Sequence, residues 1–438
     1  MKTASRSVRK TSALAILGGP AAVTLPAKDL FTWPIVTGAD ERAVLAVLRR
    51  GAMSDSDVTL KFEAAWAQWH GSRYALSFCN GTSAIQAALW ACGVGAGREV
   101  IAPTLAYWAS SLPALSLGAT INFADVLPGT LCIDPADIEH RISRYTRAIV
   151  VVHNHGYPCD MREILAIARR RKLKVIEDVS HAHGGEYRGK MLGTLGDVGC
   201  FSMMSGKAFP TGEAGMLVTD NRGLWERAVA FGHYERTGRS NYAKTAAVLT
   251  DPSLIEFAGL PQGGCKHRIN QLCSAMGLTQ LARYPRRMAE IQEAMNLFWD
   301  LLEGVPGVRA HRPAKSSGST MGGWYAPVGL YVSEELGGMP IARFAEAVRA
   351  EGCPVYGFSE FPLHLHPLLQ KADIYGHGKP TVLANAHRDV RQGPGSLPIA
   401  EGIRSRVFSI PWFKHHRPRQ IRQYSQAIRK VCENWKLL

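Results

Sequence analysis

The sequence predicts an α/β protein, with a mainly parallel sheet in a large domain and a smaller C-terminal α+β domain. Its 438 residues, of which 46% are hydrophobic and 20% charged, are enough to bury a full core. Between about residues 60 and 290, short β-rich runs alternate with helical apolar periodicity, which is typical of a parallel sheet covered by helices on both faces. A long helical pattern at 286–302 then leads into a second set of strands and helices. We expect an N-terminal arm at 1–58, a large domain at 59–290 and a small C-terminal domain at 291–438.

The individual elements follow from the apolar periodicity. In the large domain, helices are expected at 84–92, 138–142 and 161–170, and strands at 100–102, 119–123, 148–152 and 173–177. In the C-terminal part, strands are expected at 308–309 and 328–332, and helices near 341–351 and at 418–436. Residues 376–395 are polar and rich in Gly, Pro, His and Arg, which predicts a loop. In sheets of this kind, ligands bind at the carboxyl ends of the strands.

The basic composition raises the question of an anionic partner. The chain has 51 Lys plus Arg against 36 Asp plus Glu, a net charge of +15, which suits nucleic acid or phosphorylated ligands. The densest basic runs, at 169–174 and 414–419, lack the interleaved aromatics of a nucleic-acid platform and favour solvated helix faces. We therefore expect no nucleic-acid partner. A basic nucleic-acid-binding regulatory protein is kept as the non-enzyme alternative, supported by the charge alone.

The cysteines and the start of the chain bear on the compartment. The nine cysteines are scattered, with no CxxC pair and no metal-finger spacing, which favours structural thiols in a reducing cytoplasm. The basic start is followed by an apolar run of only residues 13–17, too short for an export signal. No window approaches eighteen apolar residues, so no membrane span is expected. We predict a cytoplasmic protein.

Small and hydroxyl residues mark the start of the first predicted helix. The run Asn80 to Ser83 comes directly before 84–92, and backbone N–H groups at a helix start favour an anion such as a phosphate. An ordinary N-cap explains the same residues equally well. The two interpretations remain open from this motif alone.

Two side chains near strand ends suit a planar, nitrogen-containing ring. Asp178 ends the apolar strand pattern at 175–178, where an ionised carboxylate can hold a pyridinium nitrogen protonated and make the ring an electron sink. A strand-end Asp is also a common turn residue. Tyr107 follows the strand at 100–102 and can stack on such a ring, although core packing is the commoner role of an aromatic there.

Lys207 is placed like a reactive amine. It follows the run 196–202 and precedes the glycine-containing run 212–216, so small residues allow close backbone approach on either side of it. A solvated surface lysine is the plain alternative, and it is the commoner one for any single lysine.

Other patterns are set aside. The histidine pairs at 364 and 366 and at 415 and 416 have no carboxylate or cysteine at a matching spacing, so no metal site is expected. The glycine-rich run 93–97 follows a helix and precedes a strand, the reverse of a dinucleotide fingerprint, and predicts a turn. Residues 153–156 follow a strand and could line a cofactor pocket without binding metal.

From about residue 14 to the C-terminus, the chain resembles the DegT/DnrJ/EryC1/StrS aminotransferase family, which makes amino sugars and aminocyclitols. The motifs that carry the resemblance are Asn80–Ala84, Glu177–Asp178 with His181–Ala182, Gly196–Asp197 with Phe201–Ser202, Lys207, and Gly212–Glu213. The resemblance implies an aspartate-aminotransferase-like fold of type I and pyridoxal 5′-phosphate as the cofactor.

The resemblance also assigns roles to the residues of those motifs. It implies that Gly81 and Thr82 bind the cofactor phosphate together with Ser202, and that Tyr107 stacks on the pyridine ring. It places Asp178 at the ring nitrogen, His181 near the ring hydroxyl, and Lys207 in the Schiff base with the cofactor. Lys207 and Asp178 are the catalytic residues.

The sequence departs from the family pattern at three positions. Ala106 replaces a usual threonine, Ala214 a usual glycine, and Lys266 an asparagine that commonly reaches the neighbouring subunit's cofactor phosphate. A lysine could make that contact by charge. The resemblance therefore implies a homodimer with shared active sites, a C2 arrangement being the default, and Lys266 is the residue expected to cross.

The expected reaction is transamination. The resemblance implies that L-glutamate or L-glutamine is the amino donor and that Lys207 moves the proton; relatives with histidine at this position dehydrate instead. Residues 14–20 and Trp33–Pro34 resemble members that act on ketocyclitols in antibiotic biosynthesis, and a keto sugar nucleotide stays open as the acceptor. Dehydration or decarboxylation by the same cofactor is the enzymatic alternative.

Overall fold

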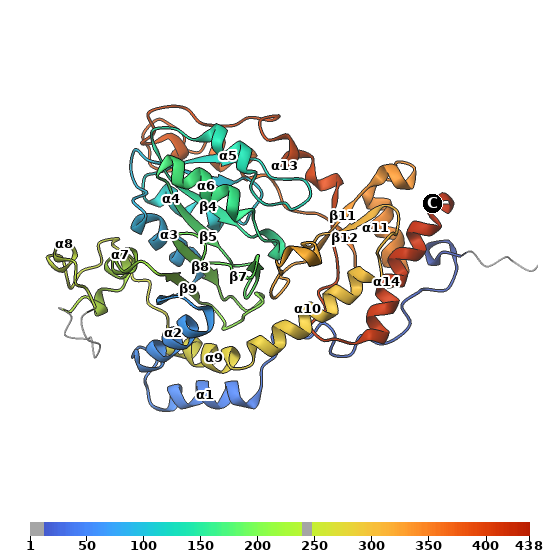
Figure 1. The fold of residues 1–438 in the computed structure, drawn as a ribbon, viewed down its shortest axis with the longest axis horizontal. Helices are drawn as coiled ribbons and strands as arrows, with labels where there is room; N and C mark the ends of the chain where they lie inside the picture. The colour runs from blue at the N-terminus through green and yellow to red at the C-terminus, as the bar shows by residue number, and fades with distance from the viewer. Residues whose placement is uncertain (1–12, 239–247) are drawn as a thin grey trace, which may run out of the picture.

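A computed structural model describes residues 13–238 and 248–438, so the first twelve residues of the predicted arm lie outside the described residues. Figure 1 shows a large unit built around one sheet, a smaller unit near the C-terminus, and the long helix α10 (Tyr284–Asp300) running from one to the other. Within the described residues, no helix combines the length and the apolar character that crossing a membrane requires.

The large unit contains a seven-stranded sheet in the order β1-β9-β8-β5-β4-β2-β3. Its strands are β1 (Tyr74–Phe78), β2 (Glu99–Pro103), β3 (Thr120–Ala124), β4 (Thr146–Val152), β5 (Lys174–Asp178), β8 (Val198–Ser202) and β9 (Gly215–Thr219). Within this sheet β9 pairs antiparallel with both neighbours, and the other pairings are parallel. The mainly parallel sheet is confirmed, and the four strands expected between 100 and 177 are present within about two residues of their expected bounds.

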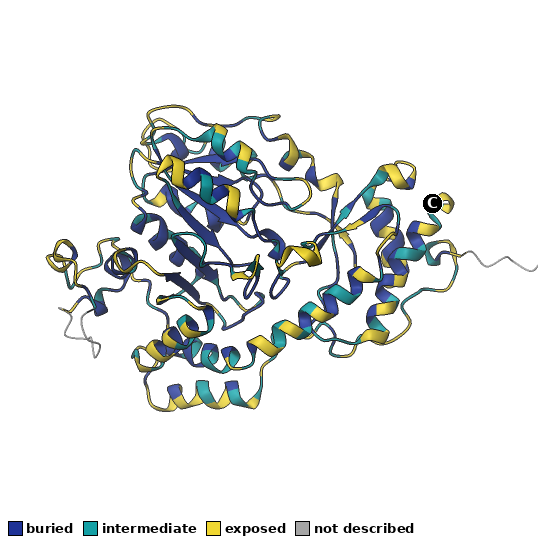
Figure 2. Ribbon diagram, viewed as in Figure 1, coloured by how far each residue is buried: buried dark blue, intermediate teal, exposed yellow. Residues whose placement is uncertain are grey.

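Helices cover both faces of this sheet because its central strands alternate their side chains between two cores. Along β4, Ala148, Val150 and Val152 pack in the core beneath α3 (Gly81–Ala91) and α7 (Arg222–Gly232). Ile149 and Val151 pack in a second core under α5 (Pro135–Arg141) and α6 (Met161–Arg171). The strands of the sheet are accordingly buried in Figure 2.

Helix caps explain where the structure extends two expected helices. The side chain of Asn80 accepts a hydrogen bond from the backbone N–H of Ser83, so α3 begins at Gly81 rather than at 84. Asp134 caps α5 in the same way, through the backbone N–H of Ala136, so that helix begins at Pro135. Gly93, at φ +81°, follows α3 and opens the turn expected at 93–97.

Further helices border the large sheet. They are α1 (Gly38–Arg49), α2 (Asp57–His70), α4 (Pro113–Ser116), α8 (Pro252–Ile255) and α9 (Gln271–Leu281), and a small hairpin joins β6 (Glu186–Tyr187) to β7 (Lys190–Met191). Glu63 of α2 accepts hydrogen bonds from the backbone and hydroxyl of Ser77 on β1 and pairs with Arg236, all three being buried. This network fixes α2 against the sheet.

The small unit is built on a four-stranded sheet in the order β10-β11-β13-β12. Its strands are β10 (Val308–Ala310), β11 (Val328–Tyr331), β12 (Tyr356–Gly357) and β13 (Val407–Ser409), with the helices α11 (Ile341–Ala350) and α14 (Pro418–Glu433) packed nearby; α12 (Pro367–Gln370) and α13 (Pro398–Gly402) lie between β12 and β13 in the chain. Leu14 and Leu30 belong to the same core as Phe298 and Ile421. The start of the described chain thus packs in the small unit.

Residues 363–397 cross back to the large unit. Leu369, Val382 and Leu397 pack in the core beneath α3. The side-chain amide of Gln392 accepts from the backbone N–H of Phe123 on β3, at 3.1 Å, and donates to its carbonyl, at 2.6 Å. Within 376–395, expected as a loop, the short 3-10 turn at Thr381–Leu383 is the regular element. The ranges 1–58, 59–290 and 291–438 stay a prediction, and each core draws on distant parts of the chain.

Candidate active site

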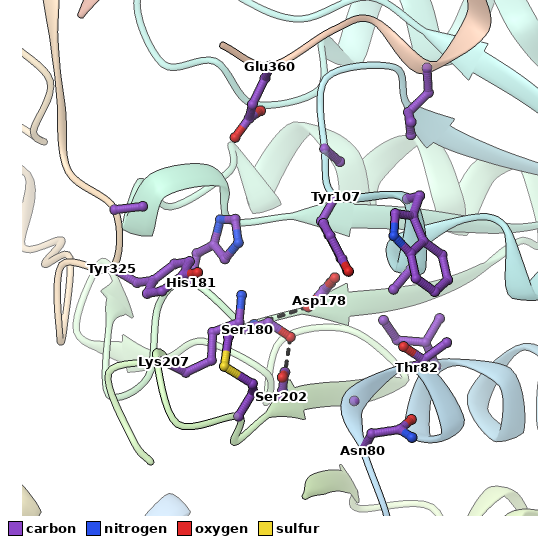
Figure 3. A pocket seen from close by; sticks show the side chains of 18 of the residues that line it. Asn80, Thr82, Tyr107, Asp178, Ser180, His181, Ser202, Lys207, Tyr325 and Glu360 are labelled. Carbon is purple, nitrogen blue, oxygen red and sulfur yellow. Dashed lines mark hydrogen bonds between the residues drawn. The ribbon is translucent and has the colours of Figure 1, made fainter. Parts of the chain in front are cut away.

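A cavity of about 480 Å³ opens at the carboxyl ends of β5 and β8 and at the start of α3. It brings together seven of the residues singled out in the sequence: Gly81, Thr82, Tyr107, Asp178, His181, Ser202 and Lys207. Tyr325 and Glu360 also line it (Figure 3), as does Ala326. The position at the strand ends is the one expected for this type of sheet.

The N-terminus of α3 forms one end of the cavity. The first N–H groups of a helix have no acceptor within the helix, and those at Gly81 and Thr82 stand at this end. A Cβ added at Gly81 would lie 2.7 Å from the Cβ of Ser202, so only glycine allows α3 and β8 to approach this closely. Asn80 is the N-cap, and the two interpretations of the motif are therefore compatible: the cap satisfies Ser83 and leaves the first turn open to an anion.

Asp178 is held at both carboxylate oxygens. The hydroxyl of Ser110 donates to Oδ2 at 2.6 Å, and the backbone N–H of Ser180 donates to Oδ1 at 3.0 Å. Asp178 is buried, and the Ser180 hydroxyl in turn accepts from the backbone N–H of Ser202 (Figure 3). Charge-assisted bonds of this kind fix the plane of the carboxylate.

Lys207 is a buried amine rather than a surface lysine. Its side chain is 7% exposed, and Nζ lies 4.0 Å from the centre of the Tyr325 ring. Burial lowers the pKa of Lys207 to about 8, against the opposing influence of the carboxylates of Asp178 and Glu360. The indole Nε1 of Trp33 donates to the Lys207 carbonyl at 3.0 Å and fixes the backbone that carries the amine.

His181 is a neutral donor that faces the cavity. The backbone N–H of His155 donates to Nδ1 of His181 at 3.3 Å, so the ring proton is on Nε2. Burial, with help from the positive charge of Lys207, holds the pKa of His181 well below its ordinary value. The imidazole can therefore donate from Nε2 and stays uncharged at neutral pH.

Tyr107 lines the cavity, whereas Lys266 does not. The side chain of Tyr107 is among the exposed large hydrophobics and lines the cavity mouth, with its ring 5.1 Å from that of Trp108. Lys266 is exposed and is not among the residues that line this cavity. The neighbouring Arg268 bridges to Phe78 at the end of β1. Lys266 is thus the one predicted site residue that lies outside the cavity of its own chain.

Sequence reasoning missed four cavity residues or their supports: Ser110, Ser180, Tyr325 and Glu360. Ser110 reaches Asp178 across 68 positions of sequence, and no local pattern reveals such a contact. Tyr325 stands between Trp324 and Ala326, which have positive φ angles of 55° and 48°. Positive φ usually marks a glycine, and because neither residue is a glycine, the sequence gives no sign of this backbone conformation. Strained backbone of this kind tends to gather at functional sites.

The histidines set aside as metal ligands make ordinary contacts. His364 is buried between the hydroxyl of Thr104 and the carboxylate of Glu401. His415 lies against Glu290. In residues 13–238 and 248–438, no group of three or more His, Cys, Asp or Glu side chains is arranged to hold a metal ion.

Comparison with known proteins gives a consistent result. Residues 34–429 match the DegT/DnrJ/EryC1/StrS aminotransferase family. The chain is 34% identical to the L-glutamine:scyllo-inosose aminotransferase of Streptomyces griseus, over 82% of this chain and 83% of the relative. It is 33% identical to the GDP-perosamine synthase of Escherichia coli O157:H7, over 64% of this chain and 73% of the relative. An aminotransferase from Psychrobacter cryohalolentis has a similar structure, with a TM-score of 0.78 and 26% identity, covering 93% of this chain and all of that one.

The structural likeness confirms the fold expected from the resemblance, an aspartate-aminotransferase-like fold of type I with a mainly parallel central sheet. The family match covers nearly the whole chain and includes each of the motifs that line the cavity. The chain is an aminotransferase, and it belongs to the DegT/DnrJ/EryC1/StrS aminotransferase family.

Proposed function

We propose that this aminotransferase uses pyridoxal 5′-phosphate to move an amino group from L-glutamine or L-glutamate to the keto group of a cyclitol or a sugar. The observation that carries the proposal is that one cavity holds a helix N-terminus, a buried carboxylate and a buried amine, at Gly81, Asp178 and Lys207. These are the three groups that a pyridine ring with a phosphate and an aldehyde needs.

The residues present fit this cofactor. The close approach of Gly81 to Ser202 leaves the N–H groups at the start of α3 and the Ser202 hydroxyl beside one another, as a phosphate requires. Asp178, fixed by two hydrogen bonds, would hold the ring nitrogen protonated. Tyr107 would stack on the ring and Thr82 would help to bind the phosphate.

Bound there, pyridoxal 5′-phosphate would supply an aldehyde that condenses with amines and a ring that takes up negative charge. Lys207 would hold the cofactor through its amine, and the free amine would accept a proton and return it. Because burial lowers the pKa of Lys207 to about 8, a useful fraction of the amine is neutral near pH 8 and can take that proton. The Nε2–H of His181 would donate to the ring hydroxyl and fix the orientation of the ring.

The names of the related proteins support the proposed donor and acceptor. The names of similar proteins include L-glutamine as the donor, which supports L-glutamine here, and L-glutamate is the close chemical alternative. Scyllo-inosose and 2-deoxy-scyllo-inosose appear in relatives that the chain covers to about four fifths, which supports a ketocyclitol in aminocyclitol or antibiotic biosynthesis. The GDP-perosamine synthase keeps a nucleotide-linked keto sugar as the second candidate.

The proposal includes a homodimer in the cytoplasm, with active sites shared between subunits. The support is that Lys266 is exposed and stands outside its own cavity, near the end of β1, where a second subunit could receive it. There it would contact the phosphate of the partner's cofactor by charge.

The test is the donor reaction in isolation. The purified protein loaded with pyridoxal 5′-phosphate is mixed with L-glutamine or L-glutamate, and conversion of the cofactor to its amine form is followed by absorbance and mass spectrometry. Wild type and Lys190→Ala, an exposed lysine of β7, are expected to convert the cofactor, and Lys207→Ala is expected not to. If wild type bound no cofactor, the proposal would be wrong. Release of carbon dioxide or loss of water from the acceptor would favour the alternative reaction types.

A further inference from the structure

Glu360 faces the cavity from a segment that spans the two units. At one end, the backbone N–H of Phe358 donates to the carbonyl of Val407 on β13 in the small unit. At the other end, the N–H of Leu363 donates to the carbonyl of Thr104, directly after β2 of the large sheet. The backbone on either side of Glu360 is thus anchored, and the side chain lines the cavity. Figure 3 shows this side chain directed inward, on the side opposite Asn80.

His155 lies beside Glu360 with one nitrogen unused. Its ring Nδ1 lies 2.8 Å from the carbonyl oxygen of Ala326, and since a carbonyl can only accept, Nδ1 carries the proton. In the neutral ring Nε2 then presents a lone pair, whereas in the protonated ring Nε2–H would pair with Oε1 of Glu360, 3.5 Å away. His155 is held in a left-handed conformation, with φ at +51°, which the rest of the structure must impose.

With the neutral ring, both groups present acceptors without a donor. Nε2 of His155 and Oε2 of Glu360 are buried, and neither has a hydrogen-bond partner within the described residues. The side chain of His155 is 4% exposed. A buried acceptor that is not satisfied costs free energy, and groups of this kind in a binding cavity are usually satisfied by the ligand.

We infer that His155 and Glu360 determine acceptor specificity by receiving hydrogen bonds from neighbouring hydroxyls of an unlinked ketopolyol. This inference rests on the proposed function, and it selects between the two acceptors left open there. A ring with adjacent hydroxyls supplies two or more O–H donors to this pair of acceptors. A diphosphate placed against Glu360 would supply acceptors only, and the carboxylate would repel its charge.

The location agrees with an acceptor site rather than a cofactor site. Glu360 lines the same cavity as Lys207 and Tyr325, and its charge raises the pKa of both groups, so a polyol bound at Glu360 shares the cavity with the reactive amine. The phosphate end of the cavity, at Asn80 and Thr82, is on the opposite side in Figure 3. The cofactor and the polyol thus have separate ends of one cavity.

Separate kinetic measurements of the donor and acceptor half-reactions test the roles of His155 and Glu360. In Glu360→Gln and His155→Asn, the second of which keeps a residue that tolerates positive φ, the donor half-reaction with L-glutamine is expected to fall much less than the acceptor half-reaction. Because Glu360 raises the pKa of Lys207, the two half-reactions are compared at a pH above that pKa. With scyllo-inosose and 2-deoxy-scyllo-inosose as acceptors, kcat/KM is expected to fall about 10-fold to 100-fold, mainly through KM, since a hydrogen bond to a charged group is lost. Glu303→Gln, at an exposed position outside the cavity, is the matched control and is expected to behave as wild type.

Binding and chemical-shift measurements give readouts independent of turnover. Saturation-transfer NMR with myo-inositol, an unreactive polyol, is expected to show weaker binding to Glu360→Gln than to wild type. Histidine nitrogen shifts are expected to show Nε2 of His155 without a proton, and to move when the polyol is added.

Several results would overturn the inference. One is a wild type that aminates nucleotide-linked keto sugars and not the unlinked ketopolyols. Another is a donor half-reaction that falls as much as the acceptor half-reaction in the variants, which would indicate a structural role. A wild type without any donor half-reaction would instead contradict the proposed function itself, so the two failures are distinguishable.

Discussion

At Lys207 the environment works against the charged form of the amine. Burial lowers its pKa from 10.5 to about 8, and the nearby carboxylates of Asp178 and Glu360 recover part of the loss. The same burial that disfavours the ammonium in the folded protein makes the neutral, nucleophilic amine accessible near physiological pH.

The reaction of cofactor-free protein with pyridoxal 5′-phosphate should therefore depend on pH in a defined direction. The rate should rise as pH is raised and level off above about 8, and at pH 6 it should be about 100-fold below the plateau, since each unit below the pKa cuts the neutral fraction tenfold. Stopped-flow absorbance measures this rate, with Lys207→Ala as the blank. A rate that keeps rising up to the pKa of an ordinary lysine would show that burial does not act on this amine.

The sequence could identify the site residues that stand in local motifs, and it could not identify those that arrive from elsewhere. Asp178 ends an apolar strand, and Lys207 stands among small residues, so both carry a local signal. Ser110, Tyr325 and Glu360 carry none, because their role arises from contacts between distant segments. The roles carried over from the family to Gly81, Thr82, Tyr107, His181 and Ser202 remain proposals about residues that the fold does gather in one cavity.

Among the elements, α2 and β1 are joined by a buried ion pair rather than by apolar contact alone. Glu63 receives two hydrogen bonds from Ser77 and two from Arg236, whose side chain is 2% exposed. Burial of a charge is tolerated here because both carboxylate oxygens accept hydrogen bonds and the charge is paired with Arg236.

Removing one partner of this pair should be costly. Arg236→Met leaves the Glu63 carboxylate buried and only partly satisfied, and it is expected to lower the free energy of unfolding by about 3–5 kcal/mol. Guanidinium denaturation followed by circular dichroism measures the change. Arg343→Met breaks a surface pair with Glu346 on α11 and should cost less than about 1 kcal/mol, which makes it the matched control. Equal losses in the two variants would contradict the role of the buried network.

The strands that could be predicted from the sequence are those made of continuous apolar residues. β2 to β5 are apolar runs buried in the middle of a parallel sheet, and the periodicity finds them. The periodicity does not predict β1 or β9, and it shows β8 only as a motif. β8 contains Gly199 and β9 begins with Gly215, and strand propensity disfavours glycine. A Cβ on Gly199 would lie 2.5 Å from the carbonyl oxygen of Gly193, so close packing, not propensity, explains that glycine.

At the scale of the whole molecule, the chain passes four times between its two units. Leu14 and Leu30 begin in the core of the small unit, and residues 363–397 return from there to the large sheet. A division by sequence assumes contiguous ranges, and it cannot anticipate such returns because each depends on tertiary contacts alone.

Sharing of active sites between subunits can be tested with mixed dimers. If Lys266 serves the partner's cofactor, a dimer of one Lys207→Ala subunit and one Lys266→Ala subunit retains one intact site. A random one-to-one mixture should then recover roughly a quarter of wild-type activity at limiting cofactor, since half of the dimers are mixed in a C2 assembly and each has one of two sites. Activity of the co-expressed, purified mixture measures this. Recovery no greater than the mean of the two single variants would place Lys266 in its own subunit's site or in none.

The amide of Gln392 bears on whether the large sheet can pair with the sheet of another molecule. β3 is the last strand on its side of the sheet, and a bare last strand invites another chain to continue the ladder. At Phe123 the side-chain amide of Gln392 occupies both the N–H and the carbonyl, much as the peptide group of one more strand would. The glutamine thus occupies the edge of the sheet at this residue, so a strand of another molecule cannot extend the ladder there.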